Sequence, residues 1–243
     1  MKYLDFFIEF NLYLLLPTII FGLLFHLLST KSEINILKRG WLFYVLFSWI
    51  GTPIHEFSHY IMCLIFRFKV NEVKLFRPIK GKKDGTLGYV NYEYNTRSFY
   101  QKIGNFFVGI APMIGGSLSI YGLFRLLLNP LYQNLIILDN FSISAIFDVI
   151  LSTKYDIFYL IIFVYLTINI AMHMSISSQD LKNAIYGGIW LEILLLIISI
   201  ILTITNISLL FYIIQFFMIL IFCFMIGFIS NIFTLLLTNI LSN

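Results

Sequence analysis

Long apolar stretches constrain this chain more than any other feature of its sequence. A helix needs about 20 apolar residues to cross the hydrocarbon core of a bilayer. About six stretches approach that length, at residues 6–28, 41–66, 103–128, 156–176, 185–205 and 208–237. The composition agrees, because 60% of the 243 residues are hydrophobic and only 12% are charged. A soluble domain carries about twice that charged fraction. The sequence therefore predicts an all-α polytopic membrane protein with about six transmembrane helices.

The first apolar stretch is expected to remain in the protein as a membrane segment. Asp5 and Glu9 interrupt it, and no small-residue cleavage site of a signal peptide follows. With no internal repeat or soluble domain, residues 1–243 are expected to form a single membrane domain. The net charge of +4 does not indicate nucleic-acid binding, because the basic residues lie between apolar runs. Cys63 and Cys223 each lie within such a run, so no disulfide framework is predicted.

The segment between the second and third apolar stretches has a different pattern. Apolar and polar residues alternate in VNEVKLF and in TLGYVNYEY, as in strands, and GKKDG between them is typical of a turn. We expect a β-hairpin of about 69–79 and 86–94, inserted after the second helix. Because a hairpin edge cannot face lipid, it should lie at the membrane surface or line a protein cavity. A solvated basic loop is the alternative for this segment.

The distribution of Lys and Arg residues predicts which helix ends face the cytosol. With six spans, one side receives eleven of these residues and the other side five, and most of the eleven lie in 67–102. We therefore expect a multi-pass protein of the cell membrane whose two termini and hairpin face the cytosol. The high content of Ile, Phe, Asn and Lys is typical of an AT-rich bacterial genome.

Residues 55–59, HEFSH, place three ionisable side chains inside the second apolar stretch. His55 and His59 are four residues apart, so on a helix both imidazoles project from one face and can bind one metal ion. Glu56 lies beside the first histidine and could accept a proton from a metal-activated water without being a ligand. Because ionisable groups at membrane depth usually mark a working site, the motif predicts zinc binding. A polar helix–helix contact without metal, or an inactive site, is the alternative.

A zinc hydrolase has three protein ligands and one open coordination position. Asp180 follows the fourth apolar stretch in a polar break, 177–179, that could turn back towards the histidines. His173, at the end of that stretch, and Glu192, in the fifth, are the other candidates for the third ligand. The histidines should lie in the cytosolic half of the second span, since they precede Arg67 by about 12–18 Å of helix rise.

These features together resemble the site-2 protease family of intramembrane zinc metalloproteases. The resemblance covers about residues 41–185, a three-helix core that contains the hairpin and precedes C-terminal helices at 185–238. GNFFVGIAPMIGG, at 104–116, resembles the family's small-residue and proline-containing stretch. LTINIAMHMSISSQD, at 166–180, resembles its asparagine-containing segment before the ligand aspartate. The chain departs from the family at that aspartate, where Gln-Asp-Leu replaces Leu-Asp-Gly.

The resemblance implies a zinc-dependent endopeptidase that hydrolyses membrane proteins or peptides in or near the cytosolic half of the bilayer. Its zinc ligands would be His55, His59 and Asp180. Glu56 would act as the catalytic base. Asn169 would hold the substrate strand or stabilise the oxyanion, with an interhelical hydrogen bond as the alternative role.

Two other functions are compatible with the motif. A membrane zinc peptidase of the prenyl-protein-processing type also carries HExxH in a membrane helix, and it would use Glu192 as the third ligand. A membrane protein that retains the metal site without catalysis is the second alternative. The sequence does not indicate an oligomeric state.

Overall fold

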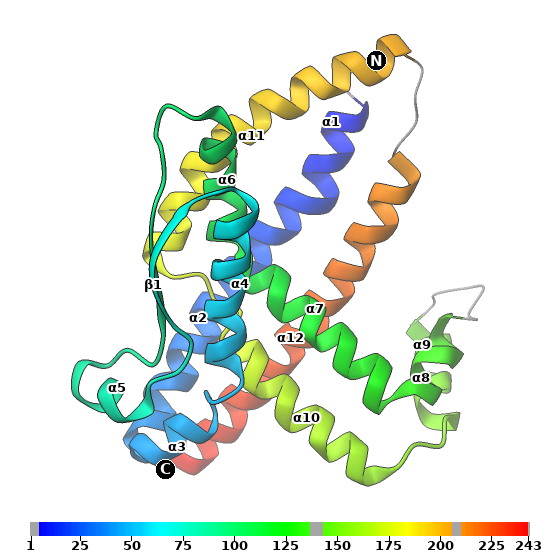
Figure 1. Cartoon of the computed structure of the whole chain (residues 1–243). Coiled ribbons are helices and arrows are strands. Elements are labelled where there is room, and N and C mark those ends of the chain that lie inside the picture. The colour runs from blue at the N-terminus through cyan, green and yellow to red at the C-terminus, as the bar shows by residue number, and fades with distance from the viewer. Residues whose placement is uncertain (1–4, 137–142, 206–209, 243) are drawn as a thin grey trace.

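The computed structural model describes residues 5–136, 143–205 and 210–242, which form helices and one small sheet (Figure 1). The chain begins with α1 (Asp5–Phe10), a π-helical segment (Asn11–Leu15) and α2 (Leu16–Lys38), followed by α3 (Trp41–Leu46) and α4 (Gly51–Ile65). Then come β1 (Lys69–Lys74), α5 (Pro78–Asp84) and β2 (Tyr89–Glu93). The remaining helices are α6 (Phe99–Gly109), α7 (Ala111–Leu127), α8 (Asn129–Ile136), α9 (Ile143–Ser152), α10 (Ile157–Met172), α11 (Ser178–Thr205) and α12 (Leu210–Ser242).

Membrane-spanning character is clear in part of this architecture. Within the described residues, three helical stretches are long and apolar enough to cross a membrane, namely Asp5–Lys38, Ser178–Thr205 and Phe216–Ile240. The bent pair α6 and α7 brings the number to four if it forms one span. These helices indicate a membrane protein. The count of six spans stays a prediction, because α4 has only 15 residues and α10 only 16.

The predicted second and third spans are both interrupted. Within 41–66 the regular helix breaks between α3 and α4. Within 103–128, α6 and α7 meet at a bend of 54°. Pro112 lies in the first turn of α7, and a proline has no N–H to bond the carbonyl four residues earlier in a helix. The bend therefore follows from the sequence, and it leaves a backbone carbonyl of α6 free for another donor.

The predicted fourth and fifth spans meet inside the molecule. α10 ends at Met172 and α11 begins at Ser178, earlier than the predicted residue 185. Between them lies Met174, which is 0% exposed. Figure 1 shows α10 and α11 running in succession from one end of the molecule to the other, and α1 begins at the end opposite to the one where α12 stops. The prediction that both termini lie on one side of the membrane stays a prediction.

The hairpin prediction is confirmed, with shorter strands than expected. β1 and β2 pair antiparallel, with Lys69 opposite Glu93 and Lys74 opposite Tyr89. The GKKDG stretch is not a simple turn, because most of it belongs to α5. This helix has Pro78 in its first turn and ends at Asp84, and the following Gly85 has a left-handed φ of 77°, as is common just after a helix.

The hairpin packs along α4. Part of it therefore lies at the end of α4 opposite Arg67, and the basic residues there must be counted on the other side of the predicted membrane. The Trp41 indole N–H donates to the Pro78 carbonyl oxygen at 3.0 Å, so α5 lies beside α3, at the end of α4 opposite Arg67 (Figure 1). Four basic residues predicted on the Arg67 side therefore lie at the other end: Arg77, Lys80, Lys82 and Lys83. The count becomes seven against nine, and it no longer supports the predicted orientation.

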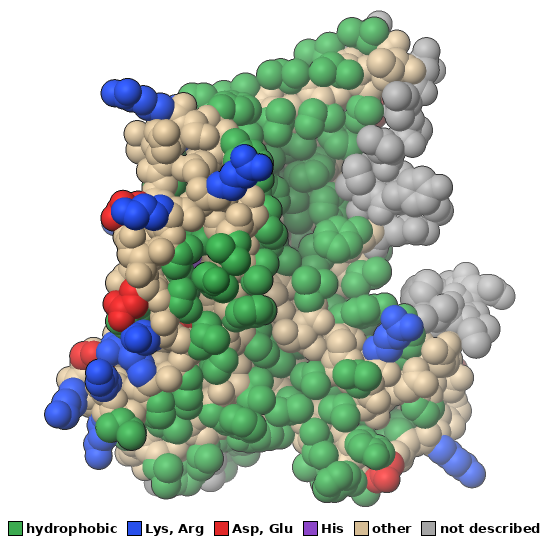
Figure 2. Space-filling view, viewed as in Figure 1, with side chains coloured by type: hydrophobic (Ala, Val, Ile, Leu, Met, Phe, Trp, Pro, Cys, Tyr) green, Lys and Arg blue, Asp and Glu red, His purple; other side chains and the backbone are tan. Residues whose placement is uncertain are grey.

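Charged and apolar side chains are segregated on the surface. On the face shown in Figure 2, most of the charged side chains lie along the hairpin and α5, while hydrophobic side chains cover most of the rest. Leu126 and Ile204 are 79% and 70% exposed. Inside, one main core joins α2, α6, α7, α10, α11 and α12, with Phe25, Met113 and Met174 fully buried.

Candidate metal centre

Three side chains from two helices converge in the structure. The Nε2 atoms of His55 and His59, one turn apart on α4, are 3.2 Å from each other. The Oδ1 atom of Asp180, in the first turn of α11, is 3.6 Å from the Nε2 atom of His59. One ligand atom from each residue lies within 4.8 Å of the other two. The structure therefore brings together the three residues expected to bind a metal.

His59 is oriented by the bend between α6 and α7. Its Nδ1 atom lies 2.9 Å from the Val108 carbonyl oxygen. This is the carbonyl that Pro112, four residues later, cannot bond, because proline has no N–H. A carbonyl oxygen can only accept a hydrogen bond, so Nδ1 of His59 carries a proton, and Nε2 of the neutral ring is the nitrogen that can bind a metal ion.

His55 is oriented in the same way by the end of α10. Its Nδ1 atom lies 2.7 Å from the carbonyl oxygen of His173, the residue directly after that helix. Carbonyls at a helix C-terminus have no partner within the helix, so this one is free to accept. The proton again sits on Nδ1, and the Nε2 lone pair of His55 points towards that of His59.

Two neutral imidazoles with facing lone pairs fit a cation between them. For Zn–N bonds of about 2.0–2.1 Å in a tetrahedron, two nitrogen ligands are about 3.3 Å apart. The observed separation of 3.2 Å is close to this value. Zinc-binding histidines also commonly donate their second N–H to a backbone carbonyl, as both do here. Two imidazoles and a carboxylate are therefore a suitable donor set for zinc.

Asp180 is held in place by a capping box at the start of α11. Its Oδ2 atom accepts hydrogen bonds from the Ser177 backbone N–H, at 3.2 Å, and from the Ser177 hydroxyl, at 2.5 Å. The Ser177 Oγ atom accepts in turn from the Asp180 N–H at 3.1 Å. This is the reciprocal pattern of an S-x-x-D capping box. It occupies Oδ2 and leaves Oδ1 directed at His59.

Glycines let α11 approach close enough to bring Asp180 to the histidines. A Cβ atom on Gly109 of α6 would lie 2.5 Å from the Asp180 carbonyl oxygen. A Cβ atom on Gly187 of α11 would lie 2.1 Å from the Phe106 nitrogen. Small residues permit such backbone contact between membrane helices. A larger side chain at either position would push the start of α11 away from α4.

Glu56 lies in the same cavity as the histidines, beneath the hairpin. The cavity has a volume of about 440 Å³, and its walls include Glu56, the triad of His55, His59 and Asp180, and residues 88–92. Glu56 is 9% exposed. A Cβ atom on Gly88 would lie 2.7 Å from Glu56 Cγ, so the chain just before β2 packs closely against the methylene part of this side chain. The arrangement places a proton acceptor beside the triad without making it a ligand.

Tyr92 contributes a hydroxyl group to the same cavity. Its oxygen accepts a hydrogen bond from the Asn183 side-chain amide at 2.8 Å. Burial raises the pKa of the Tyr92 phenol above its ordinary value, because the charged form is poorly solvated. The phenol therefore stays protonated and keeps its own hydrogen available for donation.

The remaining candidate residues lie elsewhere. The His173 ring donates from Nδ1 to the Asn169 carbonyl oxygen at 3.0 Å, and only its backbone carbonyl reaches His55. Asn169 is fully buried, and its amide donates within α10 to the Tyr165 carbonyl at 3.1 Å. It is not among the residues that line the metal cavity, so its predicted role in substrate binding stays a prediction.

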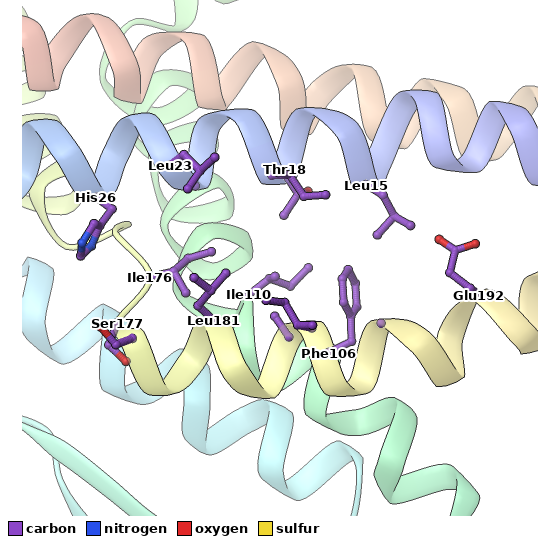
Figure 3. Close-up of a pocket in the computed structure, with 16 residues that line it drawn as sticks. Leu15, Thr18, Leu23, His26, Phe106, Ile110, Ile176, Ser177, Leu181 and Glu192 are labelled. Atoms are coloured by element: carbon purple, nitrogen blue, oxygen red, sulfur yellow. The ribbon is translucent and has the colours of Figure 1, made fainter.

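Glu192 belongs to a second cavity. Figure 3 shows it at one end of a space between α2 and α11, with His26 near the other end. This cavity has a volume of about 260 Å³ and a mostly apolar lining. Glu192 accepts a hydrogen bond from the Asn11 side chain at 3.2 Å. Neither His173 nor Glu192 joins the triad among the described residues.

Three contributors to the centre were not predicted from the sequence. Ser177 could have been found, because Ser177-x-x-Asp180 is a capping-box pattern before an apolar helix. The free carbonyl of Val108 could also have been predicted, because Pro112, four residues later, has no N–H to donate to it. Tyr92 was predicted in a strand, but no local pattern shows that its side chain turns towards α11.

Comparison of the chain with protein-family models, with curated proteins and with solved structures gives no match.

Proposed function

We propose that this chain is a zinc-dependent endopeptidase of the membrane, similar to site-2 proteases. One observation carries the proposal. His55 and His59 each donate Nδ1–H to a backbone carbonyl and direct Nε2 at one point beside Asp180. Two Nε2 atoms 3.2 Å apart need a cation, a proton or a metal ion, between them when both rings are buried. The HExxH motif, with Glu56 in the same cavity, then points to hydrolysis rather than to metal storage.

The residues of the cavity divide the chemistry between them. Zinc, when bound, supplies Lewis-acid activation of water and of a peptide carbonyl. Glu56 accepts the proton of the attacking water and passes it to the leaving amine, which general acid–base catalysis requires. Tyr92 donates its hydroxyl hydrogen to the oxygen on which negative charge develops. The backbone carbonyls of Val108 and His173 hold the two imidazoles in the tautomer that binds the metal.

The hairpin supports a peptide substrate in extended conformation. Residues 88–92 line the metal cavity, whereas no residue of β1 does so among the described residues. The sheet has two strands in this part of the chain, so the second edge of β2 can pair with an added strand. We propose that a segment of a membrane protein unwinds and pairs there, with its scissile bond beside Glu56.

The position of Glu192 argues against the prenyl-protein-type alternative. That class would draw its third ligand from Glu192, which is bonded to Asn11 in the second cavity. A non-catalytic metal protein is the remaining alternative. It shares the triad with the proposed peptidase and differs from it only in the role of Glu56.

Glu56→Gln is the decisive experiment. The purified variant should keep the zinc content of the wild type, because Glu56 is not a ligand. Its cleavage of a quenched-fluorescent peptide library with apolar segments, in detergent micelles, should fall by about 10²–10⁴-fold, the contribution typical of a general base. His55→Ala serves as the comparison and should lose zinc and activity together. Undiminished cleavage by Glu56→Gln would exclude this mechanism.

A further inference from the structure

The C-terminal end of α10 is bonded by side chains from other helices. Its last carbonyls have no partner within the helix itself, and the Ala171 carbonyl accepts one backbone bond from the Met174 N–H that follows, at 3.2 Å. His55 of α4 donates to the His173 carbonyl at 2.7 Å, and Asn231 of α12 donates to the Ala171 carbonyl at 2.8 Å. The helix end that orients a metal-binding histidine is thus also held by the C-terminal helix.

The Asn231 side chain is itself fixed in one orientation. It is 0% exposed, and its Oδ1 atom accepts a hydrogen bond from the Ser29 hydroxyl of α2 at 3.2 Å. Because Ser29 occupies the oxygen, the amide nitrogen faces Ala171. Both polar atoms of the side chain are paired, so the amide links α2, α12 and α10 at one buried point.

We infer that Asn231 is a positioning residue for the metal centre, acting from α12 through the end of α10. Asn231 holds Ala171, and His173 lies two residues further along the same turn. If that turn shifts, the His173 carbonyl moves away from His55 Nδ1 and the imidazole is no longer held with Nε2 towards His59. Groups that orient metal ligands in this way tune metal affinity. This inference rests on the proposed zinc site.

The effect should appear in zinc affinity, measured by competition with a chromogenic chelator on the purified protein in detergent. Asn231→Asp keeps the size of the side chain but removes the N–H donor, and we expect zinc to bind about tenfold more weakly, the lower end of the range for groups that orient a ligand. Asn231→Leu should weaken it at least as much. Ser29→Ala removes the hydrogen bond that fixes the Asn231 amide but keeps its N–H donor, so it should have a smaller effect in the same direction.

Thr234→Val is the matched control. Thr234 is also 0% exposed on α12, but its hydroxyl bonds the Ser230 carbonyl of its own helix at 2.7 Å. We expect wild-type zinc affinity for this variant. The absorption spectrum of the cobalt-substituted protein gives a second readout that does not depend on activity, and it should change in Asn231→Asp and not in Thr234→Val.

Two outcomes separate the inference from the proposed function. If His55→Ala loses zinc while Asn231→Asp binds it as the wild type does with an unchanged cobalt spectrum, Asn231 is a packing residue and the inference is wrong. If His55→Ala itself binds zinc normally, the proposed metal site is wrong and the inference falls with it. Should Asn231→Leu fail to fold, Asn231→Asp still decides between these results.

Discussion

Helix α11 carries two carboxylates that lie in very different cavities. Asp180, in its first turn, faces a cavity of about 440 Å³ that also contains His55, His59 and Glu56. Glu192, further along the same helix, lies at the end of an apolar cavity of about 260 Å³ beside α2 (Figure 3). Ser177 lines both cavities, so the two spaces are neighbours.

The comparison teaches that partners, and not position in an apolar helix, decide what a buried carboxylate can do. Asp180 has one oxygen fixed by Ser177 and the other aimed at His59. Glu192 has a single described partner, Asn11, and it belongs to no group of three metal-ligating side chains among the described residues. The first carboxylate is therefore suited to complete a metal site, and the second to join α11 to the π-helical segment at Asn11.

Replacing each carboxylate by alanine tests this contrast and should give the largest effect. Asp180→Ala removes a proposed ligand. Changing groups that only orient a ligand already costs about 10–100-fold in affinity, so we expect zinc affinity to fall by roughly 100-fold or more. Glu192→Ala should retain the zinc content of the wild type. Metal analysis of both purified variants measures the difference, and the reverse pattern would support the prenyl-protein-type alternative.

Gly88→Ala should damage activity in the metal cavity without removing the metal. The added Cβ would lie 2.7 Å from Glu56 Cγ and 2.8 Å from the Leu75 carbonyl oxygen, so Glu56 or β2 must move. A misplacement of about 1 Å can cost roughly 100-fold in rate. Zinc content should stay at the wild-type value. Gly122→Ala is the control, because a Cβ there meets no atom within 4 Å. Equal cleavage rates for the two variants would show that β2 does not constrain Glu56.

Ser177→Ala should have an intermediate effect, because it weakens the hold on Asp180 and leaves the ligand itself. Loss of the capping hydroxyl should destabilise the start of α11 by about 1 kcal/mol and weaken zinc binding about tenfold. Chelator competition and thermal unfolding measure the two effects. Ser178→Ala removes the neighbouring hydroxyl, outside the capping box, and should change neither. A Ser177→Ala variant with wild-type zinc affinity would mean that α11 positions Asp180 through its backbone alone.

The sequence allowed the proposed ligands to be predicted, but not the groups that orient them. His55 and His59 follow from a spacing that a helix converts directly into one face, and Asp180 from a polar break beside an apolar stretch. Their orientation depends on which backbone carbonyls are left unpaired and on which helix lies opposite. Pro112 marks one such carbonyl in the sequence. The contact between the end of α10 and Asn231 joins residues far apart in the chain, and no local pattern encodes it.

Contacts between distant residues also explain why the helices were predicted more accurately than the number of membrane crossings. Apolar stretches near residues 156–176 and 185–205 do form helices, because a helix satisfies its own backbone groups in lipid. Whether a helix crosses or stops depends on what covers its end. α10 ends at Met172, and side chains of other helices bond the carbonyls there: Asn231 donates to Ala171, and His55 to His173, the residue after the helix. The length of the apolar stretch alone could not have predicted where α10 ends.

Asn11→Leu should give the smallest effect and tests whether the apolar cavity is independent of the metal centre. The variant loses the hydrogen bonds that the Asn11 amide donates to Phe7 and Glu192. Hydrogen bonds between membrane helices contribute about 0.6 kcal/mol on average, so we expect a small fall in thermal stability. Zinc affinity should not change, because neither hydrogen bond of Asn11 involves a residue that binds or orients His55 or His59. Weaker zinc binding by this variant would show that a change in the apolar cavity reaches the metal site through Ser177, which lines both. Glu192 would then influence zinc binding as Asp180 does, only more weakly.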